Sequence, residues 1–388
     1  MKSMFKKFAA VVLALAMVLS LAACGGSNYT SGNTEFVIGV SGPLTGPAAV
    51  YGTAVKNSAQ MAVDEINANG GLNGVKFKLV ATDDTHDATK VAANYASMLE
   101  GGMQVSLGTV TTAPGLEFTK LSAEDNVFFI TPSASGDAIP ANDNGFQMCF
   151  ADGNQGKVAA DYVNSLGLTE IGIFYKSDDA YSNGIYKQFK ENLDSSIKTV
   201  EAVFTDTNAT DFSSQITTLK DCKFIFMPIY YEPATIFLTQ AKNTIAADAV
   251  YYGCDGFDGL AGQFEDFSVI PQEVSMLSHF DSNATDGAAG EFIKKYTDKF
   301  GTETLNQFGA SAYDCVYAIY EAMKAAVDAG TEIDVTISAS DLCEILKEQF
   351  TGDFTFSGVT GNNITWEDNG YVAKEAVKYT LKTANSAQ

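Results

Sequence analysis

The alternation of strand-like and helix-like segments from residue 35 onward is the feature that most constrains the fold of this chain. Short runs of apolar and β-branched residues are each followed by a longer segment whose apolar residues recur at helical spacing. Phe36–Val40 and Thr53–Ala68 form the first such pair, and Asn-Gly-Gly at 69–71 ends the predicted helix. Further strands are predicted at 76–81, 104–110 and 127–131, with helices at 89–99 and 115–124 between them. This pattern predicts an α/β lobe of right-handed βαβ units around a parallel sheet.

A second alternating series begins near Gln155 and predicts a second α/β lobe. Its strands are predicted at 171–175, 200–204, 224–229, 250–253 and 274–280, and its helices include 186–193 and 212–219. Three successive helices are then predicted at 288–300, 310–329 and 341–350, followed by a turn-rich, strand-like stretch at 356–382. Because the late helices no longer alternate with strands, we expect the chain to cross between the two lobes more than once.

The chain is strongly acidic, with 47 Asp and Glu against 24 basic residues and a formal net charge of −23. All of the basic residues are Lys, and none is Arg. Nucleic-acid binding is excluded, because it requires a basic surface that releases counterions from the phosphates. The absence of Arg also removes the planar group best suited to bidentate binding of a carboxylate. An anionic ligand must therefore be bound by Lys, hydroxyl groups or backbone N–H groups.

The N-terminal segment has the pattern of a cleaved export signal. A basic start is followed by an apolar run from Phe8 to Leu19, which is shorter than the ~20 residues that span a bilayer. Leu-Ala-Ala-Cys at 21–24 resembles the lipobox of bacterial lipoproteins. We therefore predict a signal peptide at 1–23, a lipid on Cys24 that anchors the protein to the outer side of the cell membrane, and a polar tether at 24–34. The alternative is an ordinary signal peptide with an incidental Cys.

The sequence lacks the residue sets that are typical of catalysis or of a metal site. Only two His occur, His86 and His279, and no nucleophile elbow, phosphate-binding loop or zinc-protease motif is present. The Cys residues after Cys24 are widely spaced, and we predict them to be buried free thiols, with one disulfide as the alternative. They are Cys149, Cys222, Cys254, Cys315 and Cys343. We therefore expect no enzyme activity, no cofactor and no metal.

The loops that follow the predicted strands indicate where a ligand binds, because ligands of open parallel sheets bind at the carboxyl ends of the strands. In the first lobe, the loops at 41–46, 111–114 and 131–135 are rich in hydroxyl groups and carry no cation. Thr112 lies beside a predicted helix N-terminus, where free N–H groups and the helix dipole favour an anion. In the second lobe, the loops at 175–181, 230–233 and 253–259 carry aromatic and acidic residues. This arrangement predicts a small zwitterionic ligand with an apolar part.

Several of these segments resemble the branched-chain amino-acid-binding proteins, which are the extracytoplasmic receptors of ABC importers. The resemblance is carried by residues 37–46, by Asp-Glu-Ile-Asn-Ala-Asn-Gly-Gly-Leu-Asn-Gly at 64–74, and by Asp83 and Asp84. Segments 129–135, 313–315 and 356–361 extend it over nearly the whole mature chain. The resemblance implies a type I periplasmic-binding fold, with two doubly wound lobes joined by three crossings. On this basis lobe 1 comprises 35–151 and 282–355, and lobe 2 comprises 152–281 and 356–388.

The resemblance also implies which residues bind the ligand. Thr112, the backbone of Ser133, and Ser135 would contact the α-carboxylate, and Tyr230 and Asp255 would contact the ammonium group. The side-chain pocket would be lined by Tyr51, Tyr181, Val110 and Phe308. The best-known members of the family have Glu at the position of Asp255, so Asp258 is a rival for the ammonium contact. The shorter acid brings the ammonium nearer the second lobe or leaves room for a water. The size of the ligand therefore cannot be inferred from the resemblance.

The function implied by the resemblance is the capture of a small amino acid with an aliphatic or aromatic side chain. The expected partners are that amino acid and an ABC permease in the membrane, and we expect the receptor to be a monomer. Two alternatives stay open: a receptor of the same fold for an aromatic acid, a short amide or urea, and a ligand sensor for a separate signalling protein.

Overall fold

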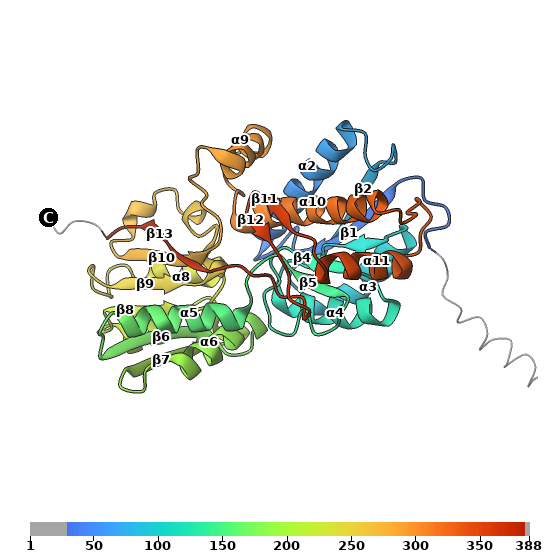
Figure 1. Cartoon of the computed structure of the whole chain (residues 1–388). Helices are drawn as coiled ribbons and strands as arrows, with labels where there is room; N and C mark the ends of the chain where they lie inside the picture. The colour runs from blue at the N-terminus through green and yellow to red at the C-terminus, as the bar shows by residue number, and fades with distance from the viewer. Residues whose placement is uncertain (1–28, 385–388) are drawn as a thin grey trace, which may run out of the picture.

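The computed structural model describes residues 29–384, which form two lobes lying side by side (Figure 1). Each lobe contains one β-sheet of mostly parallel strands with helices packed against it. The predicted α/β class with two doubly wound lobes is therefore confirmed. The predicted signal peptide, Cys24 and the first part of the tether lie outside the described residues.

The first lobe is built on a five-stranded, parallel sheet in the order β2-β1-β3-β4-β5. Strand β1 is buried along its whole length, which explains why its sequence is a continuous run of apolar and small residues. The strands are β1 Phe36–Gly42, β2 Phe77–Asp83, β3 Val105–Ser106, β4 Phe129–Thr131 and β5 Gly145–Gln147. The helices that connect them are α2 Ala49–Ala68, the 3-10 turn η1 Ala88–Lys90, α3 Val91–Glu100 and α4 Thr112–Asp125.

The second lobe is built on a six-stranded sheet in the order β13-β10-β9-β8-β6-β7, in which only β13 runs antiparallel to its neighbour. The strands are β6 Glu170–Lys176, β7 Lys198–Phe204, β8 Phe224–Met227, β9 Val250–Gly253, β10 Glu273–Ser278 and β13 Val377–Lys382. The α-helices are α5 Asp152–Ser165, α6 Ala180–Asn192, α7 Ser213–Leu219 and α8 Tyr231–Ala241. Short 3-10 turns follow β7 and β9 at η2 Asp206–Asn208, η3 Asp255–Phe257, η4 Ala261–Gln263 and η5 Phe267–Val269.

Helix α5 was not among the helices named from the sequence, although the second alternating series was expected to begin near Gln155. Its first turns contain Gly153, Asn154 and Gly156, which lower helix propensity. Packing against α6 overrides that propensity, since a Cβ at Gly156 would lie 2.6 Å from Cβ of Gln188. The glycine therefore allows the two helices to approach closely, and packing stabilises a segment of low helix propensity.

The chain crosses between the lobes between β5 and α5, between β10 and α9, and finally before β13 (Figure 1). Helices α9 Gly287–Phe300, α10 Gln307–Asp328 and α11 Ala339–Thr351 follow the second crossing, and α10 packs along α2 of the first lobe. A small hairpin of β11 Phe356–Gly358 and β12 Gly361–Ile364 then precedes the last crossing.

The last boundary differs from the one inferred from the sequence, which assigned 356–388 to the second lobe. The hairpin contacts α10, and Trp366 donates from Nε1 to the carbonyl of Gln147 in β5, at 2.8 Å. Tyr371 similarly donates to the carbonyl of Asp137 in the first lobe, at 2.6 Å. Only β13 joins the second sheet, so most of the segment before residue 377 packs on the first lobe.

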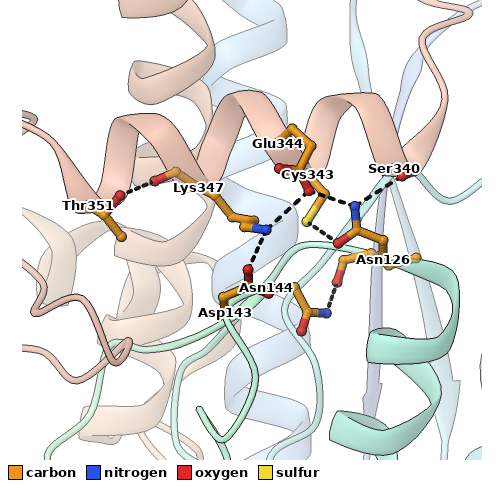
Figure 2. A network of polar contacts seen from close by, with 9 residues as sticks. Asn126, Asp143, Asn144, Ser340, Cys343, Glu344, Lys347 and Thr351 are labelled. Carbon is orange, nitrogen blue, oxygen red and sulfur yellow. Dashed lines mark hydrogen bonds and ion pairs between the residues drawn. The ribbon is translucent and has the colours of Figure 1, made fainter.

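A polar network attaches α11 to the first lobe (Figure 2). Lys347 forms an ion pair with Asp143 in the loop between β4 and β5, with 2.7 Å between Nζ and Oδ2. Asn126 ends α4 in the left-handed conformation, with a φ of 49°, and its amide nitrogen donates to Ser340 and Glu344 of α11. The late helix therefore holds one end of α4 in place, and Thr112 begins the other end.

The five cysteines among the described residues are all buried and form no disulfide, as predicted. None of the helices between residues 29 and 384 combines the length and the apolar character that a membrane span requires.

Candidate functional site

The predicted site residues of the first lobe lie where β3 and β4 end. Thr112 is the first residue of α4, and its buried Oγ1 has no hydrogen-bond partner. Ser133 donates its hydroxyl to the carbonyl of Val110 at 2.7 Å, which leaves its backbone rather than its side chain for a ligand. Ser135 is also buried, and both serines are in the loop after β4. A helix N-terminus and an unpaired hydroxyl are thus brought together, which suits a carboxylate.

The acidic part of the site lies at the carboxyl end of β9 in the second lobe. Asp255 is 1% exposed, and its Oδ1 accepts a hydrogen bond from the Tyr181 hydroxyl at 2.6 Å. The backbone N–H of Gly256 donates to the same hydroxyl at 2.8 Å. Gly256 has no room for a side chain, since a Cβ would lie 2.7 Å from that oxygen. Burial raises the pKa of Asp255 to about 6, although these hydrogen bonds partly oppose the shift.

Aromatic rings connect the two halves of the site. The ring of Tyr230 stacks on that of Tyr181, with 4.4 Å between centroids, and Tyr51 packs edge-on against Phe308 at 4.8 Å. The hydroxyl of Tyr51, on α2 of the first lobe, donates to the carbonyl of Gly256 in the second lobe at 2.5 Å. Of the predicted side-chain pocket residues, Tyr51, Phe308 and Tyr181 therefore lie close together where the lobes touch.

Asp258 is placed differently from Asp255. Its Oδ2 accepts from the backbone N–H of Gln307, at 2.9 Å, and so faces the N-terminus of α10. Burial also raises the pKa of Asp258 to about 6. Because its carboxylate is already used to hold α10, Asp255 is the better candidate for contact with a ligand.

The buried acids of the site form no ion pair within the part of the chain that the structure describes, although Lys176 and His86 act electrostatically on Asp179. Among the ion pairs of residues 29–384, none involves an acid of this group, and the nearby Lys176 is paired with Asp206 at 2.5 Å. The group comprises Asp152, Asp179, Asp255 and Asp258. A carboxylate that is buried without a cation is costly, so the site is suited to a ligand that brings a positive charge.

A model of the family described as periplasmic binding protein matches residues 35–379 of the chain. The chain belongs to the periplasmic binding protein family. Such proteins bind solutes, and this periplasmic binding protein is accordingly not an enzyme, in agreement with the prediction from the sequence.

Its relatives include amino-acid-binding proteins. The Leu/Ile/Val-binding protein BraC3 of Rhizobium johnstonii is 28% identical over 317 residues, which cover 80% of this chain and 84% of that protein. The leucine-, isoleucine-, valine-, threonine- and alanine-binding protein of Pseudomonas aeruginosa is 29% identical over 246 residues, which cover 61% of this chain and 65% of that protein.

Among solved structures, the branched-chain amino acid transporter substrate binding protein LivJ of Streptococcus pneumoniae, in complex with isoleucine, has a TM-score of 0.73. It is 26% identical and covers 89% of this chain and 100% of that one. The resemblance to the branched-chain amino-acid-binding proteins is thus confirmed.

The structure of this periplasmic binding protein adds residues that the sequence analysis did not assign to the site. His86, in the loop after β2, contacts Thr111 Oγ1 through Nδ1 at 2.9 Å, and its ring lies edge-on to Tyr230 at 5.2 Å. Burial lowers the pKa of His86 below its usual value. The sequence signal that could have identified His86 as a site residue was its position in the loop after a predicted strand. Asp152 and Gln155, at the start of α5, were missed because that helix was not predicted.

Proposed function

We propose that this periplasmic binding protein is the receptor of an ABC importer and captures a small amino acid, with an aliphatic or aromatic side chain, between its lobes. The observation that carries the proposal is a pair of complementary groups on opposite lobes, a hydroxyl without a hydrogen-bond partner and a carboxylate without an ion-pair partner. Among residues 29–384, the buried Thr112 hydroxyl of the first lobe has no hydrogen-bond partner, and the buried Asp255 carboxylate of the second lobe belongs to no ion pair. The amino-acid-binding relatives of the chain support the same ligand class.

In this proposal the first lobe binds the α-carboxylate and the second binds the ammonium group. Thr112, the Ser133 backbone and Ser135 donate to the carboxylate at the positive end of α4. Asp255 accepts from the ammonium group, and the face of Tyr230 adds a cation–π contact. The side chain would lie among Tyr51, Tyr181, Val110 and Phe308. Closure of the lobes excludes water, which strengthens each polar contact, and presents the closed surface to the permease.

Thermal unfolding of the leaderless protein with each of the twenty amino acids tests the proposal. A ligand at 100 times its Kd stabilises the folded state by about 2.7 kcal/mol, so an upward shift of Tm is expected with a few apolar amino acids. Benzoate, acetamide and urea are the comparison ligands. A shift with these compounds and with no amino acid would overturn the proposal, as would the absence of any shift.

Replacement of Thr112 by Val is expected to weaken ligand binding without lowering the stability of the fold. The Thr112 hydroxyl is buried without a partner, so the isosteric Val should leave Tm unchanged or raise it. Affinity for the amino acid should fall about 10- to 100-fold, because a hydrogen bond to a charged group contributes about 1.5–3 kcal/mol. Isothermal calorimetry and thermal unfolding measure the two effects.

Thr119 provides the matched control on the same helix. Its hydroxyl donates to the carbonyl of Ile139 at 2.9 Å, so Thr119→Val should lower stability by about 1 kcal/mol and leave affinity unchanged. If Thr112→Val lost stability and kept its affinity, Thr112 would be a structural hydroxyl and the carboxylate assignment would be wrong.

We further propose that a lipid on Cys24 anchors the protein, as a monomer, to the outer side of the cell membrane. The N-terminal sequence pattern supports this proposal. When the full chain is expressed in a bacterium, wild type is expected in the membrane fraction and labelled by radioactive palmitate. Cys24→Ala should be unlabelled and released as a soluble protein on lysis. Palmitate labelling of Cys24→Ala at the wild-type level would contradict the anchor.

A further inference from the structure

The N-termini of helices α2 and α8 face each other where the two lobes touch. Helix α2 of the first lobe follows the N-cap residue Ala48, and α8 of the second lobe follows the N-cap residue Tyr230. Neither N-cap side chain accepts a hydrogen bond from its own helix. The first N–H groups of a helix have no partner within it, so a helix end that is buried needs partners from elsewhere.

A tyrosine hydroxyl of the opposite lobe supplies such a partner to each helix. The backbone N–H of Tyr231, the first residue of α8, donates to the hydroxyl of Tyr51 at 3.4 Å. The backbone N–H of Val50, in the first turn of α2, donates to the hydroxyl of Tyr231 at 3.5 Å. The rings of Tyr51 and Tyr231 pack edge to face, with 5.0 Å between their centroids. Each of the two tyrosines therefore caps the helix of the other lobe.

The hydroxyl of Tyr51 also makes the shortest of these contacts. It donates its hydrogen to the carbonyl of Gly256 at 2.5 Å, so its donor and its acceptor are both used on the second lobe. Gly256 directly follows Asp255, and Tyr231 directly follows Tyr230. One hydroxyl of the first lobe thus holds the two segments of the second lobe that carry the proposed ammonium contacts.

These hydrogen bonds favour the closed arrangement of the lobes. When the lobes separate, water can take the place of each partner, so the open arrangement loses little. A Phe at position 51 would leave the Gly256 carbonyl and the Tyr231 N–H without their partner only when the lobes are closed. Tyr51 and Tyr231 are 1% and 5% exposed, so water has little access to these groups in the closed arrangement.

We propose that Tyr51 and Tyr231 are positioning residues that form a latch: their hydroxyls cap the helices of opposite lobes, hold the lobes closed and so slow the release of the ligand. The ring of Tyr51 was assigned to the side-chain pocket, and its hydroxyl acquires this separate role. The proposal rests on the proposed function in one respect, since it assumes that a ligand is held between the lobes.

The first test needs no ligand and uses Tyr51→Phe, Tyr231→Phe and the double variant, which keep both rings and remove only the hydroxyls. Small-angle X-ray scattering is measured on the protein without residues 1–24, which retains every residue that the structure describes. The radius of gyration is expected to increase in each variant and most in the double variant. Radii equal to that of wild type would overturn the proposal.

Tyr251→Phe is the matched control for this test. Tyr251 is a buried residue of β9, and its hydroxyl has no hydrogen-bond partner among residues 29–384. Removal of that hydroxyl should leave the radius of gyration and the rate of ligand release unchanged. An increase in radius as large as that of Tyr51→Phe would show that loss of any buried tyrosine hydroxyl loosens the lobes, and the latch would be wrong.

The second test measures the binding and release rates of L-leucine, L-isoleucine and L-valine by stopped-flow fluorescence. Tyr51→Phe is expected to raise the release rate about 10-fold, because two buried backbone groups lose their partner. Tyr231→Phe should raise it about threefold, because it removes one longer hydrogen bond. The association rates should change by less than about twofold, since the latch forms only as the lobes close.

Tyr231→Phe also distinguishes a latch from a ligand contact, because Tyr231 is not among the proposed ligand-binding residues. Faster release from Tyr51→Phe together with wild-type release from Tyr231→Phe would assign the Tyr51 hydroxyl to the ligand and overturn the latch. A loss of Tm without a change in release rate would show a role in the fold alone and would likewise overturn it.

The two tests separate the failure of this inference from the failure of the proposed function. If wild type binds none of the twenty amino acids, the proposed function fails, while the radii of gyration still decide whether the hydroxyls hold the lobes closed. If the amino acids bind and both variants release them at the wild-type rate, the inference fails alone.

Discussion

Replacing Asp255 by Asn is expected to lower the affinity for the amino acid by at least about 100-fold. The carboxylate is 1% exposed and belongs to no ion pair among the described residues, so the ligand ammonium would be its only partner of opposite charge. Removal of one partner from a buried charge pair costs about 3–5 kcal/mol, because the other charge is left buried and unpaired. Asn keeps the size of the side chain and an oxygen that accepts from Tyr181, so the fold should be retained. Isothermal calorimetry at pH 7.5 measures the change.

Asp258→Asn is the matched control, because Asp258 is also buried and lies three residues away. Its carboxylate accepts from the N–H of Gln307, a contact that the Asn oxygen can also make, so affinity should change by less than about threefold. If Asp258→Asn lost affinity and Asp255→Asn kept it, the assignment of the ammonium contact would pass to Asp258.

The affinity of wild type is also expected to depend on pH in the acidic range. Burial raises the pKa of Asp255 to about 6, and only the ionised form attracts an ammonium group. Since an acid loses its charge as pH falls below its pKa, the affinity should fall about tenfold per pH unit below pH 6. Asp255→Asn should remove this dependence. An unchanged slope in the variant would show that another group titrates.

The fold could largely be predicted from the sequence because the central strands β1 and β8 are buried along their whole length. The segments around Val37–Val40 and Phe224–Met227 are continuous apolar runs, which local patterns identify well. Helix α5 could not be predicted, because contacts with α6 decide its conformation and Gly156 is selected for close packing rather than helix propensity. The path of residues 356–376 was wrongly assigned for a similar reason: the contact of Trp366 with Gln147 joins positions that are far apart in the sequence.

The candidate site could be predicted where its residues lie in the loops at the carboxyl ends of strands. Thr112, Tyr230 and Asp255 each come directly after a predicted strand, and the carboxyl ends of parallel strands share one edge of a sheet. Asp152 is brought to the site by the crossing between the lobes, and His86 contacts the ring of Tyr230 from the other lobe. Such contacts between lobes have no local sequence signal.

Replacing Asp314 by Ala is expected to cause a large loss of stability, centred where the last crossing leaves the first lobe. Asp314, in α10, is fully buried, and its carboxylate accepts from the backbone N–H groups of Val359 and Thr360, each at 2.8 Å. It also accepts from the Thr360 hydroxyl, which in turn accepts from Lys374 at 2.6 Å. One carboxylate thus holds the β11–β12 turn and faces Lys374 in the segment that crosses to the second lobe.

The loss should reach about 3–5 kcal/mol, since Asp314→Ala leaves two N–H groups unsatisfied and deprives Lys374 of its counter-charge. Burial already lowers the pKa of Lys374 to about 8, and Asp314 is the main group that opposes this shift. In the variant Lys374 should therefore lose its proton near neutral pH. A decrease in Tm on the order of 10 °C is expected, measured by calorimetry, which follows the lobes even when they unfold separately.

Two comparisons make this prediction specific. Asp328→Ala, at the exposed end of the same helix, removes only a surface ion pair with Lys324 and should change stability by less than about 0.5 kcal/mol. Lys374→Met should restore part of the stability that Asp314→Ala loses when the two changes are combined, because the unpaired cation is then gone. If the double variant is destabilised by the sum of the two single effects, Asp314 and Lys374 act independently, and the turn alone explains the burial of the carboxylate.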